Sequence, residues 1–555
     1  MNRLRISAIF ALVIICTLFS VPVFADTLVK DNWIITENQV VTDKTVNLTG
    51  NLVIKSHASL TLIGTNLEMN SISANQQLIS VEPGGSLYIN NSRITSTNSD
   101  HTFAINVNSG TLELKDSELK GIRIQGDSWT GWYGIEIRNA NNTIITGNTI
   151  YHGANVVAIQ IKQSQKAVIE NNTIISETPA NNIAVDLLGS DDSSISNNIF
   201  QGPQGVVRLF ESWNNHIANN TAEVSGGGLG IIIDSGSGNN IVENNNITAQ
   251  YQGVCTGIRI METTYPNLLS NNTIKGFRVG IHMSYASNAS VIGNRFIDIW
   301  QHEAIELYRS YNNLVLNNQI NSSNSGITLL ASSGNTLQGN EIQGSSDWGI
   351  GLFYTSNNNS ISGNTLDNKL INVVADNSND NSFSNNNFVG SEHQAYDNTG
   401  NNNWNQNYWS DNSSKQLSAY PIAPKGTDNN PLSDLIPKFV EPVPQFKPVP
   451  KETGLRIEDK HIVDVQTWKD RTITLQGNLI IDSGASLSLE NAVINTNEEY
   501  FRNKSFMISV KPGGTLSINN SKIFGPEKDG SLSIQVSQGA NVKVNSIIWV
   551  IGKVR

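Results

Sequence analysis

The sequence predicts an all-β fold, a parallel β-helix in which three short strands make each coil. Three observations predict it. A tripeptide of asparagine, any residue and an apolar residue recurs with a period of about 24 residues. Each period holds three short segments in which apolar and polar residues alternate, which is typical of strands with one buried face. Asn, Gly and Ser separate these segments, and such residues favour turns.

The repeat has three landmarks in every period. The first is the tripeptide asparagine, at Asn148, Asn172, Asn198, Asn245, Asn272, Asn294, Asn318, Asn340, Asn364 and Asn386, with a degenerate copy at Asn220. The second is a similar tripeptide shortly before it, such as Asn335-Thr336-Leu337. The third is Gly or Ala followed by alternating apolar residues, such as Gly134-Ile135-Glu136-Ile137. We interpret each landmark as part of one strand and its turn.

The period length selects the architecture. Three strands and their turns fill about 24 residues and leave no room for a helix, whereas a propeller blade needs about 40. Coils of three strands can stack and bury a continuous apolar interior. At the turns the repeated asparagines can hydrogen-bond the backbone, tolerate a left-handed φ and stack as a side-chain ladder. The predicted product is a stack of parallel strands.

The composition excludes several classes of protein. Charged residues are 15% of the chain, and 36 basic residues face 47 acidic ones, for a net charge of −11. A nucleic-acid-binding protein would show a basic patch or stripe, so no nucleic-acid partner is expected. The low charge also argues against a charged disordered chain. The chain is therefore expected to be a polar, folded β protein.

The N-terminal residues 1–25 are expected to be a secretory signal peptide. Arg3 and Arg5 precede an apolar run over residues 6–21, and small residues allow cleavage after Ala25. The apolar run is shorter than the about 20 residues of a membrane-spanning helix. We therefore expect a secreted, periplasmic or cell-surface protein with no transmembrane segment in the mature chain. Cys255 would be its one cysteine, which excludes a disulfide within the chain.

The chain is expected to divide into a long and a short β-helix. The predicted segments are the signal peptide 1–25, the main helix 26–410 (cap and first coils 26–130, regular coils 131–390, closing segment 391–410), an exit and linker segment 411–455, and a second module 456–555. Six of the 15 prolines lie between Pro431 and Pro450, which indicates an extended linker. The second module repeats the start of the first.

That duplication is visible in two runs. Gly477-Asn478-Leu479-Ile480-Ile481 matches the run from Gly50, and Pro512-Gly513-Gly514 opens a run that matches the one from Pro83. The second module contains few coils, and an open coil edge normally needs a cover. We therefore expect it to be incomplete, either because the chain is a truncated product or because a partner caps it.

The repeats resemble a known family. Asn171-Asn172-Thr173-Ile174 and its relatives, over residues 130–390, resemble the right-handed parallel β-helix repeats of the NosD-like family. The segments Ala395-Tyr396-Asp397-Asn398, Asn407-Tyr408-Trp409-Ser410 and Asp428-Asn429-Asn430-Pro431 resemble the family's closing segment. The resemblance implies a right-handed helix. It also implies either a periplasmic copper-binding accessory of nitrous oxide reductase or a carbohydrate-binding and sugar-hydrolysis domain.

Two columns of outward positions carry the candidate site. The first column, at the residue after the first apolar position, is Glu136, Gln160, Asp186, Arg208, Ile232, Arg259, His282, Glu306, Thr328 and Gly351. The second column, two residues later, is Arg138, Lys162, Leu188, Phe210, Asp234, Met261, Ser284, Tyr308, Leu330 and Phe353. Scarce charges gather here beside aromatic residues, which suits a saccharide. The predicted substrate-binding residues are Glu136, Arg138, Lys162, Asp186, Arg208, Phe210, Asp234 and Tyr308.

Catalysis is the first alternative to carbohydrate binding. Arg259, His282 and Glu306 occupy consecutive coils and form the candidate acid–base group for a polysaccharide lyase, epimerase or glycoside hydrolase. Asp234 is expected to lie near Arg208 and Arg259, which would keep it ionised. Whether the protein is an enzyme stays open.

Copper binding is the second alternative. Copper favours His, Met and Cys ligands. Cys255, Met261 and His282 lie in neighbouring coils, but the chain's histidines are scattered. No metal residues are therefore assigned, and copper or calcium stays a minor alternative. The preferred interpretation is a secreted β-helix protein whose partner is a polysaccharide or a cell-envelope glycan.

Overall fold

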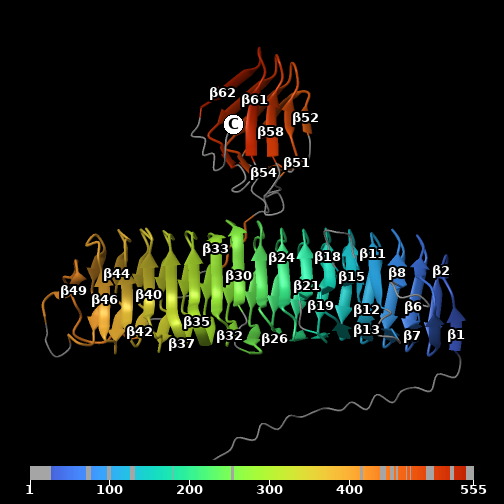
Figure 1. Cartoon of the computed structure of the whole chain (residues 1–555), viewed down its shortest axis with the longest axis horizontal. Coiled ribbons are helices and arrows are strands. Elements are labelled where there is room, and N and C mark those ends of the chain that lie inside the picture. The colour runs from blue at the N-terminus through green and yellow to red at the C-terminus, as the bar shows by residue number, and fades with distance from the viewer. Residues whose placement is uncertain are drawn as a thin grey trace, which may run out of the picture. The chain divides into compact units, whose positions relative to one another are not determined.

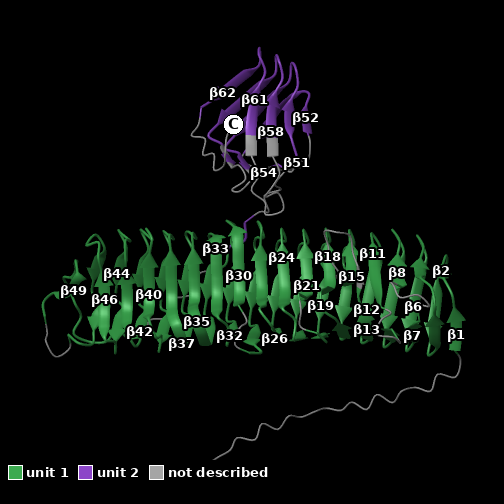
Figure 2. Ribbon diagram, viewed as in Figure 1, with its two compact units in different colours: residues 1–446 green, residues 447–555 purple. Residues whose placement is uncertain are grey.

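The computed structural model describes most of the chain. The described residues are 27–70, 77–96, 102–125, 132–178, 181–251, 255–412, 417–437, 445–449, 455–457, 460–469, 472–475, 477–495, 505–524 and 531–545. The segment expected to be a signal peptide lies outside them. The chain forms two compact units, Met1–Phe446 and Lys447–Arg555, coloured separately in Figure 2. The finer boundaries predicted from the sequence stay predictions.

The described part of the first unit is a parallel β-helix, as the sequence predicts. Figure 1 shows its coils stacked from β1 (Thr27–Lys30) to β49 (Tyr420–Pro424). Each regular coil gives one strand to each of three parallel sheets. Sheet I runs from β1 to β48 (Tyr408–Trp409), and sheet III runs from β3 (Gln39–Thr42) to β50 (Gly426–Asp428). In the described residues the structure contains no helix with the length and apolar character of a membrane span.

Sheet II carries the candidate site. Its strands, in stacking order, are β2 (Trp33–Ile35), β5 (Leu52–Ile54), β8 (Gln77–Val81), β11 (Phe103–Asn108), β15 (Trp132–Arg138), β18 (Val156–Lys162), β21 (Ile183–Leu188), β24 (Gly205–Phe210), β27 (Leu229–Asp234), β30 (Thr256–Thr263), β33 (Val279–Ala286), β35 (Arg295–Tyr308), β37 (Gln319–Leu330), β40 (Trp348–Phe353), β43 (Ile371–Ala375), β46 (His393–Asp397) and β49. The long strands β35 and β37 also run through sheet I.

The interior is built by the alternation seen in the sequence. In the Gly-Ile-x-Ile landmarks both apolar residues point inward and are fully buried, as at Ile258 and Ile260 or Ile281 and Met283. Alternate residues of a strand point to opposite faces, so the residues between and after them face outward. Burying one such side chain stabilises the fold by about 1.5–3 kcal/mol. Every coil therefore contributes to one continuous apolar core.

The predicted asparagine ladder is present. Asn245 shows its geometry: its Nδ2 donates to the Asn272 side-chain oxygen and to the Ile217 carbonyl, at 3.0 and 2.9 Å. The same pattern joins Asn148 to Asn407 coil by coil and ends at Asp428. The predicted left-handed φ is not on these asparagines. It belongs to the preceding residue, such as Asn244 or Asn271, because the chain turns just before the ladder residue.

The closing segment ends the core with aromatic rings. Trp409 is 0% exposed and stacks on Tyr420, with 4.2 Å between ring centroids. Trp404 stacks on Phe383 at 3.9 Å, and the Trp409 indole N–H donates to Asp428. Burial of both tryptophans supports a structural plug and leaves Trp409 no ring face for a sugar.

The described part of the second unit is a shorter stack of the same kind. It has three four-stranded parallel sheets with strands β51 (Leu455–Ile457), β54 (Thr472–Leu475), β57 (Val493–Asn495) and β60 (Lys522–Phe524); β52 (Lys460–Ile462), β55 (Leu479–Ile481), β58 (Ser505–Val510) and β61 (Ser531–Val536); and β53 (Val465–Lys469), β56 (Ser486–Glu490), β59 (Thr515–Asn519) and β62 (Asn541–Val544). Its core includes Leu487, Leu489, Leu516 and Ile518. The duplicated sequence therefore forms a second β-helical module.

Candidate functional site

The strand register aligns both columns as the sequence predicts. In the first column Arg259 pairs with His282, and His282 pairs with Glu306. In the second column Ser284 pairs with Tyr308, which pairs with Leu330. The same register continues back to Glu136 and Arg138 on β15. Side chains in each column are thus neighbours at the strand spacing of about 4.8 Å.

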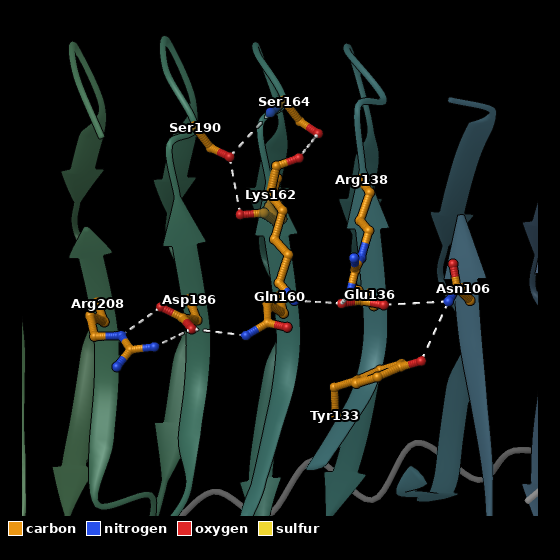
Figure 3. Close-up of polar contacts among 11 residues, drawn as sticks. Asn106, Tyr133, Glu136, Arg138, Gln160, Lys162, Ser164, Asp186, Ser190 and Arg208 are labelled. Atoms are coloured by element: carbon orange, nitrogen blue, oxygen red, sulfur yellow. Dashed lines mark hydrogen bonds and ion pairs between the residues drawn. The ribbon is translucent and has the colours of Figure 1, made fainter. Parts of the chain in front are cut away.

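The N-terminal end of the columns is a charge network, drawn in Figure 3. Glu136 Oε1 lies 2.7 Å from both Arg138 Nη2 and Lys162 Nζ, and Asn106 donates to its other oxygen at 3.3 Å. The Glu136 side chain is only 1% exposed, while that of Arg138 is 38% exposed. A ligand on this face would therefore meet the cations that cover Glu136 rather than the carboxylate itself.

The next ion pair repeats this arrangement. Arg208 forms a fork with Asp186, with Nε donating to Oδ1 at 2.8 Å and Nη2 to Oδ2 at 2.6 Å. Gln160 Nε2 also donates to Asp186 Oδ2, at 3.1 Å (Figure 3). Asp186 is fully buried, so it needs these donors to compensate for its lost hydration. Asp186 therefore holds the Arg208 guanidinium in position.

Arg259 bonds the next carboxylate of the columns, Asp234, with Nη2 donating to Oδ2 at 2.8 Å. Ile232, 5% exposed, stands between Arg208 and Arg259 in the first column and interrupts the row of charges. Arg259 is therefore held toward Asp234, and the predicted group of Arg259, His282 and Glu306 divides into Asp234–Arg259 and His282–Glu306.

The His282–Glu306 pair is more open to solvent. His282 Nδ1 and Glu306 Oε2 lie 2.8 Å apart, and their side chains are 28% and 17% exposed. Glu303 lies on the same strand as Glu306. Burial raises the pKa of the Glu303 carboxyl above its usual value, and the nearby charge of Glu306 raises it further. The sequence placed Glu303 in this coil, but its burial depends on neighbouring coils and could not be predicted.

Tyrosine rings and one arginine flank this pair. Tyr308 follows Glu306 by two residues, so both side chains lie on the outer face of β35. Tyr285 and Tyr308 meet edge to face with 5.8 Å between centroids. The Arg309 guanidinium lies over both rings, at 5.5 Å from Tyr285 and 5.4 Å from Tyr308, and Nη1 donates to the Tyr285 hydroxyl at 2.7 Å. The sequence predicted Tyr308 but missed Tyr285 and Arg309, which follow the columns in left-handed backbone.

A second aromatic pair lies on the other side of Glu306. Trp348 Nε1 donates to the Thr328 hydroxyl at 2.9 Å, and Thr328 is the neighbour of Glu306 in the first column. Trp348 meets Phe353 at 5.2 Å between centroids. Both rings occupy the space above Gly351, where a Cβ would lie 2.5 Å from Phe353 and 2.7 Å from Trp348. The two rings fit there because Gly351 has no side chain.

Phe210, a predicted binding residue, is separate from these rings. It is four coils from Tyr308 in the second column, which corresponds to about 19 Å. Its neighbours in the column are Leu188 and Asp234. We therefore define the aromatic–acid patch as His282, Glu303, Glu306, Tyr285, Tyr308, Arg309, Trp348 and Phe353.

The residues do not fit the copper site that the family resemblance implies. No group of three His, Cys, Asp or Glu side chains in the described ranges is arranged to hold a metal ion. Of the candidate soft donors, Cys255 and Met261 are partly buried, and His282 Nδ1 is engaged with Glu306. Soft donors for copper are thus dispersed or occupied.

Comparison with protein families confirms the resemblance. Residues 213–418 match the family model described as "Periplasmic copper-binding protein (NosD)", and residues 52–222 match the one described as "Right handed beta helix region". The sheet register and these matches together assign the right-handed parallel β-helix predicted from the sequence. A search of curated proteins finds no match to the chain.

Several solved structures are similar to the chain. A mutant tailspike protein of E. coli bacteriophage HK620 in complex with a pentasaccharide is 11% identical, with 66% of this chain and 72% of that chain covered and a TM-score of 0.43. The periplasmic alginate epimerase AlgG is 14% identical, with 76% and 78% covered and a TM-score of 0.29. PfbA, a surface adhesin of Streptococcus pneumoniae, is 14% identical, with 65% and 85% covered and a TM-score of 0.32. At these identities and scores the likeness bears on no ligand or activity of this chain.

Proposed function

We propose that the outer face of sheet II binds carbohydrate, and that the aromatic–acid patch is the centre of the binding site. The observation that carries this proposal is the arrangement on β33 and β35. There the partly exposed His282–Glu306 pair lies directly beside the Tyr285–Tyr308–Arg309 cluster.

Each part of the patch suits one feature of a sugar ring. The C–H face of a pyranose is apolar and packs on aromatic rings, whose faces carry partial negative charge. Its hydroxyl groups need hydrogen-bond partners of both kinds. A carboxylate accepts such bonds, and a histidine or arginine donates them. Aromatic rings with a small number of placed polar groups are the usual composition of a small-molecule site.

The location of such a partner follows from the proposed compartment. We place the protein outside the cytoplasm, in the periplasm, at the cell surface or secreted, on the predicted signal peptide and the match to a family described as periplasmic. A polysaccharide or cell-envelope glycan would be within reach there. The remaining columns, with Arg138, Lys162 and Arg208 more exposed than the carboxylates they contact, would extend the contact surface of a long glycan.

Binding can be tested by glycan-array screening followed by calorimetry with the best ligand. Tyr308→Ala should weaken binding by at least about tenfold, because it removes a central aromatic contact. Tyr88→Ala changes a partly buried tyrosine on β9 (Ser86–Asn90), a strand of sheet III, and should bind as the wild type does. Equal affinity of Tyr308→Ala and the unaltered protein would refute this site.

Acid–base chemistry on the same patch is the second candidate function. It is favoured by one observation, the raised pKa of Glu303 beside the Glu306–His282 pair. Two carboxyl groups whose environments differ can serve as acid and base. A lyase, epimerase or hydrolase would then lose turnover in Glu303→Gln and Glu306→Gln while still binding the glycan. Absence of turnover on every glycan that binds would leave binding as the function.

A further inference from the structure

We propose that Arg309 is an anion anchor and that the saccharide bound by the aromatic–acid patch is acidic, with a carboxylate or sulfate group on the sugar. The inference rests on the proposed carbohydrate binding and goes further, since it names the chemical class of the ligand.

The position of Arg309 is fixed by its tyrosine neighbours. Its guanidinium lies over the rings of Tyr285 and Tyr308 and uses Nη1 to bond the Tyr285 hydroxyl at 2.7 Å. A guanidinium has five N–H donors in a planar fork, so donors remain beside the one in use. The side chain is exposed. The cluster thus holds a charged fork in one orientation at the surface.

The basic residues of the columns differ from Arg309 in their partners. Each of them has a carboxylate at ion-pair distance: Arg138 and Lys162 contact Glu136, Arg208 contacts Asp186, and Arg259 contacts Asp234. Among the described residues, Arg309 has no carboxylate within that distance. Its positive charge is therefore not neutralised by the protein and is available to an anion.

The acidic residues of the columns do not cancel this effect. Glu306 is engaged by His282, and the Glu136, Asp186 and Asp234 carboxylates are engaged by their own cations. Charges farther away than about 8 Å are screened at physiological ionic strength, so the chain's net charge of −11 acts weakly at Arg309. A carboxylate or sulfate matches the guanidinium fork by two parallel hydrogen bonds.

The spacing also fits a glycan chain. Glu306 and Tyr308 are two residues, or about 7 Å, apart along β35, and the Arg309 guanidinium lies over the Tyr308 ring. One sugar unit could therefore place its acidic group on Arg309 and pack on Tyr308, while the next unit offers hydroxyls to Glu306 and His282. Arg309 and the His282–Glu306 pair would then bind neighbouring sugar units of the same ligand.

The experiment is calorimetry on the full chain with four probes of equal length: an oligogalacturonate, its methyl ester, a sulfated galactose oligosaccharide and a neutral cello-oligosaccharide. We expect the wild type to bind an acidic probe about tenfold or more tightly than the uncharged ones. Arg309→Gln should remove this preference, weakening the binding of acidic probes far more than that of uncharged probes, and Arg309→Lys should keep part of it. The carboxylated and sulfated probes distinguish the two anions.

A matched variant separates local from overall charge. Arg295→Gln makes the same substitution at an exposed arginine in the part of β35 that belongs to sheet I, and it should keep the acidic preference. The inference fails if Arg309→Gln binds acidic probes as the wild type does, or if the methyl ester binds as tightly as the acid. Neutral binding that is lost in Tyr308→Ala would then still support the proposed function, whereas no binding of any probe would overturn both.

Discussion

The His282 imidazole and the Glu306 carboxylate lie 2.8 Å apart although 24 residues separate them in the chain. The separation equals one coil, so residues at equivalent positions become neighbours in sheet II. The aromatic–acid patch is built in this way from β33, β35 with the residue that follows it, and β40. Its properties therefore depend on the register of successive coils.

Glu306→Gln should lower the pKa of Glu303. Burial is the main cause that raises this pKa, and the Glu306 charge is the second. Removing that charge should bring the pKa toward the usual glutamate value, but burial should still hold it above. NMR titration of the glutamate carboxyl carbons measures this. Glu392→Gln, at an exposed glutamate outside the patch, is the matched control and should leave the pKa of Glu303 unchanged.

Asn245→Ala should destabilise the first unit by about 3 kcal/mol. The substitution leaves the Ile217 carbonyl and the Asn220 backbone N–H without their ladder partner, and each buried unpaired group costs about 1–3 kcal/mol. Asn246→Ala changes the next residue, which is exposed on β29 (Asn246–Ala249), and should change stability little. Denaturant unfolding followed by circular dichroism compares them. Similar losses in both variants would show that the ladder does not stabilise the helix.

His152 should make stability fall as the solution is acidified. It lies in β17 (Thr149–His152), it is 1% exposed, and its Nε2 has no hydrogen-bond partner among the described residues. Burial lowers its pKa to about 4. Between about pH 6.5 and 4 the unfolded chain binds a proton that the folded chain does not, so the free energy of unfolding falls as pH falls, by up to about 3 kcal/mol.

Unfolding of the wild type and His152→Leu across this pH range measures the effect. The slope of stability against pH should be smaller in the variant, while His393→Gln, at an exposed histidine of β46, should keep the wild-type slope. Parallel curves for the wild type and His152→Leu would contradict a buried neutral imidazole.

Gly280→Ala should destabilise the coil that carries His282. A Cβ at this position would lie 2.6 Å from Phe296 Cδ1 and would press on the Ala304 carbonyl of the next coil. Overpacking of this kind typically costs about 1–3 kcal/mol. Gly227→Ala is the control because its Cβ would have no atom within 4 Å. In thermal melting, only Gly280→Ala should lower the transition temperature. An unchanged transition temperature would mean that neighbouring coils can move apart enough to accept the added Cβ.

The fold was predictable because its rule is local and repeated. A period of about 24 residues, alternating apolar residues and asparagine turns define the coil, and equal coil lengths define which residues become neighbours. The positions of Glu306 beside His282 and Thr328 follow from that rule. It also predicted the asparagine ladder, but it assigned the left-handed φ to the wrong residue, since the turn precedes Asn245 and its equivalents.

The site was less predictable because contacts depend on side-chain reach. Arg259 can extend toward Asp234 or toward His282, and the structure shows the first. The sequence named Glu136 and Asp186 as binding residues, and the structure covers both with cations. Tyr285, Arg309 and Trp348 lie beyond the alternating strand segment or before it, so the columns did not include them.

The sequence by itself determined the all-β coil, the alignment of the two columns and the charges that face outward, since these depend only on period and alternation. The tertiary structure decided which of those charges are neutralised, how deeply Glu303 is buried and that Arg309 lies over two tyrosines without a carboxylate at ion-pair distance among the described residues. The physical reason is that burial and pairing are set by side chains from several coils at once, which adjoin only after the chain has wound into its helix.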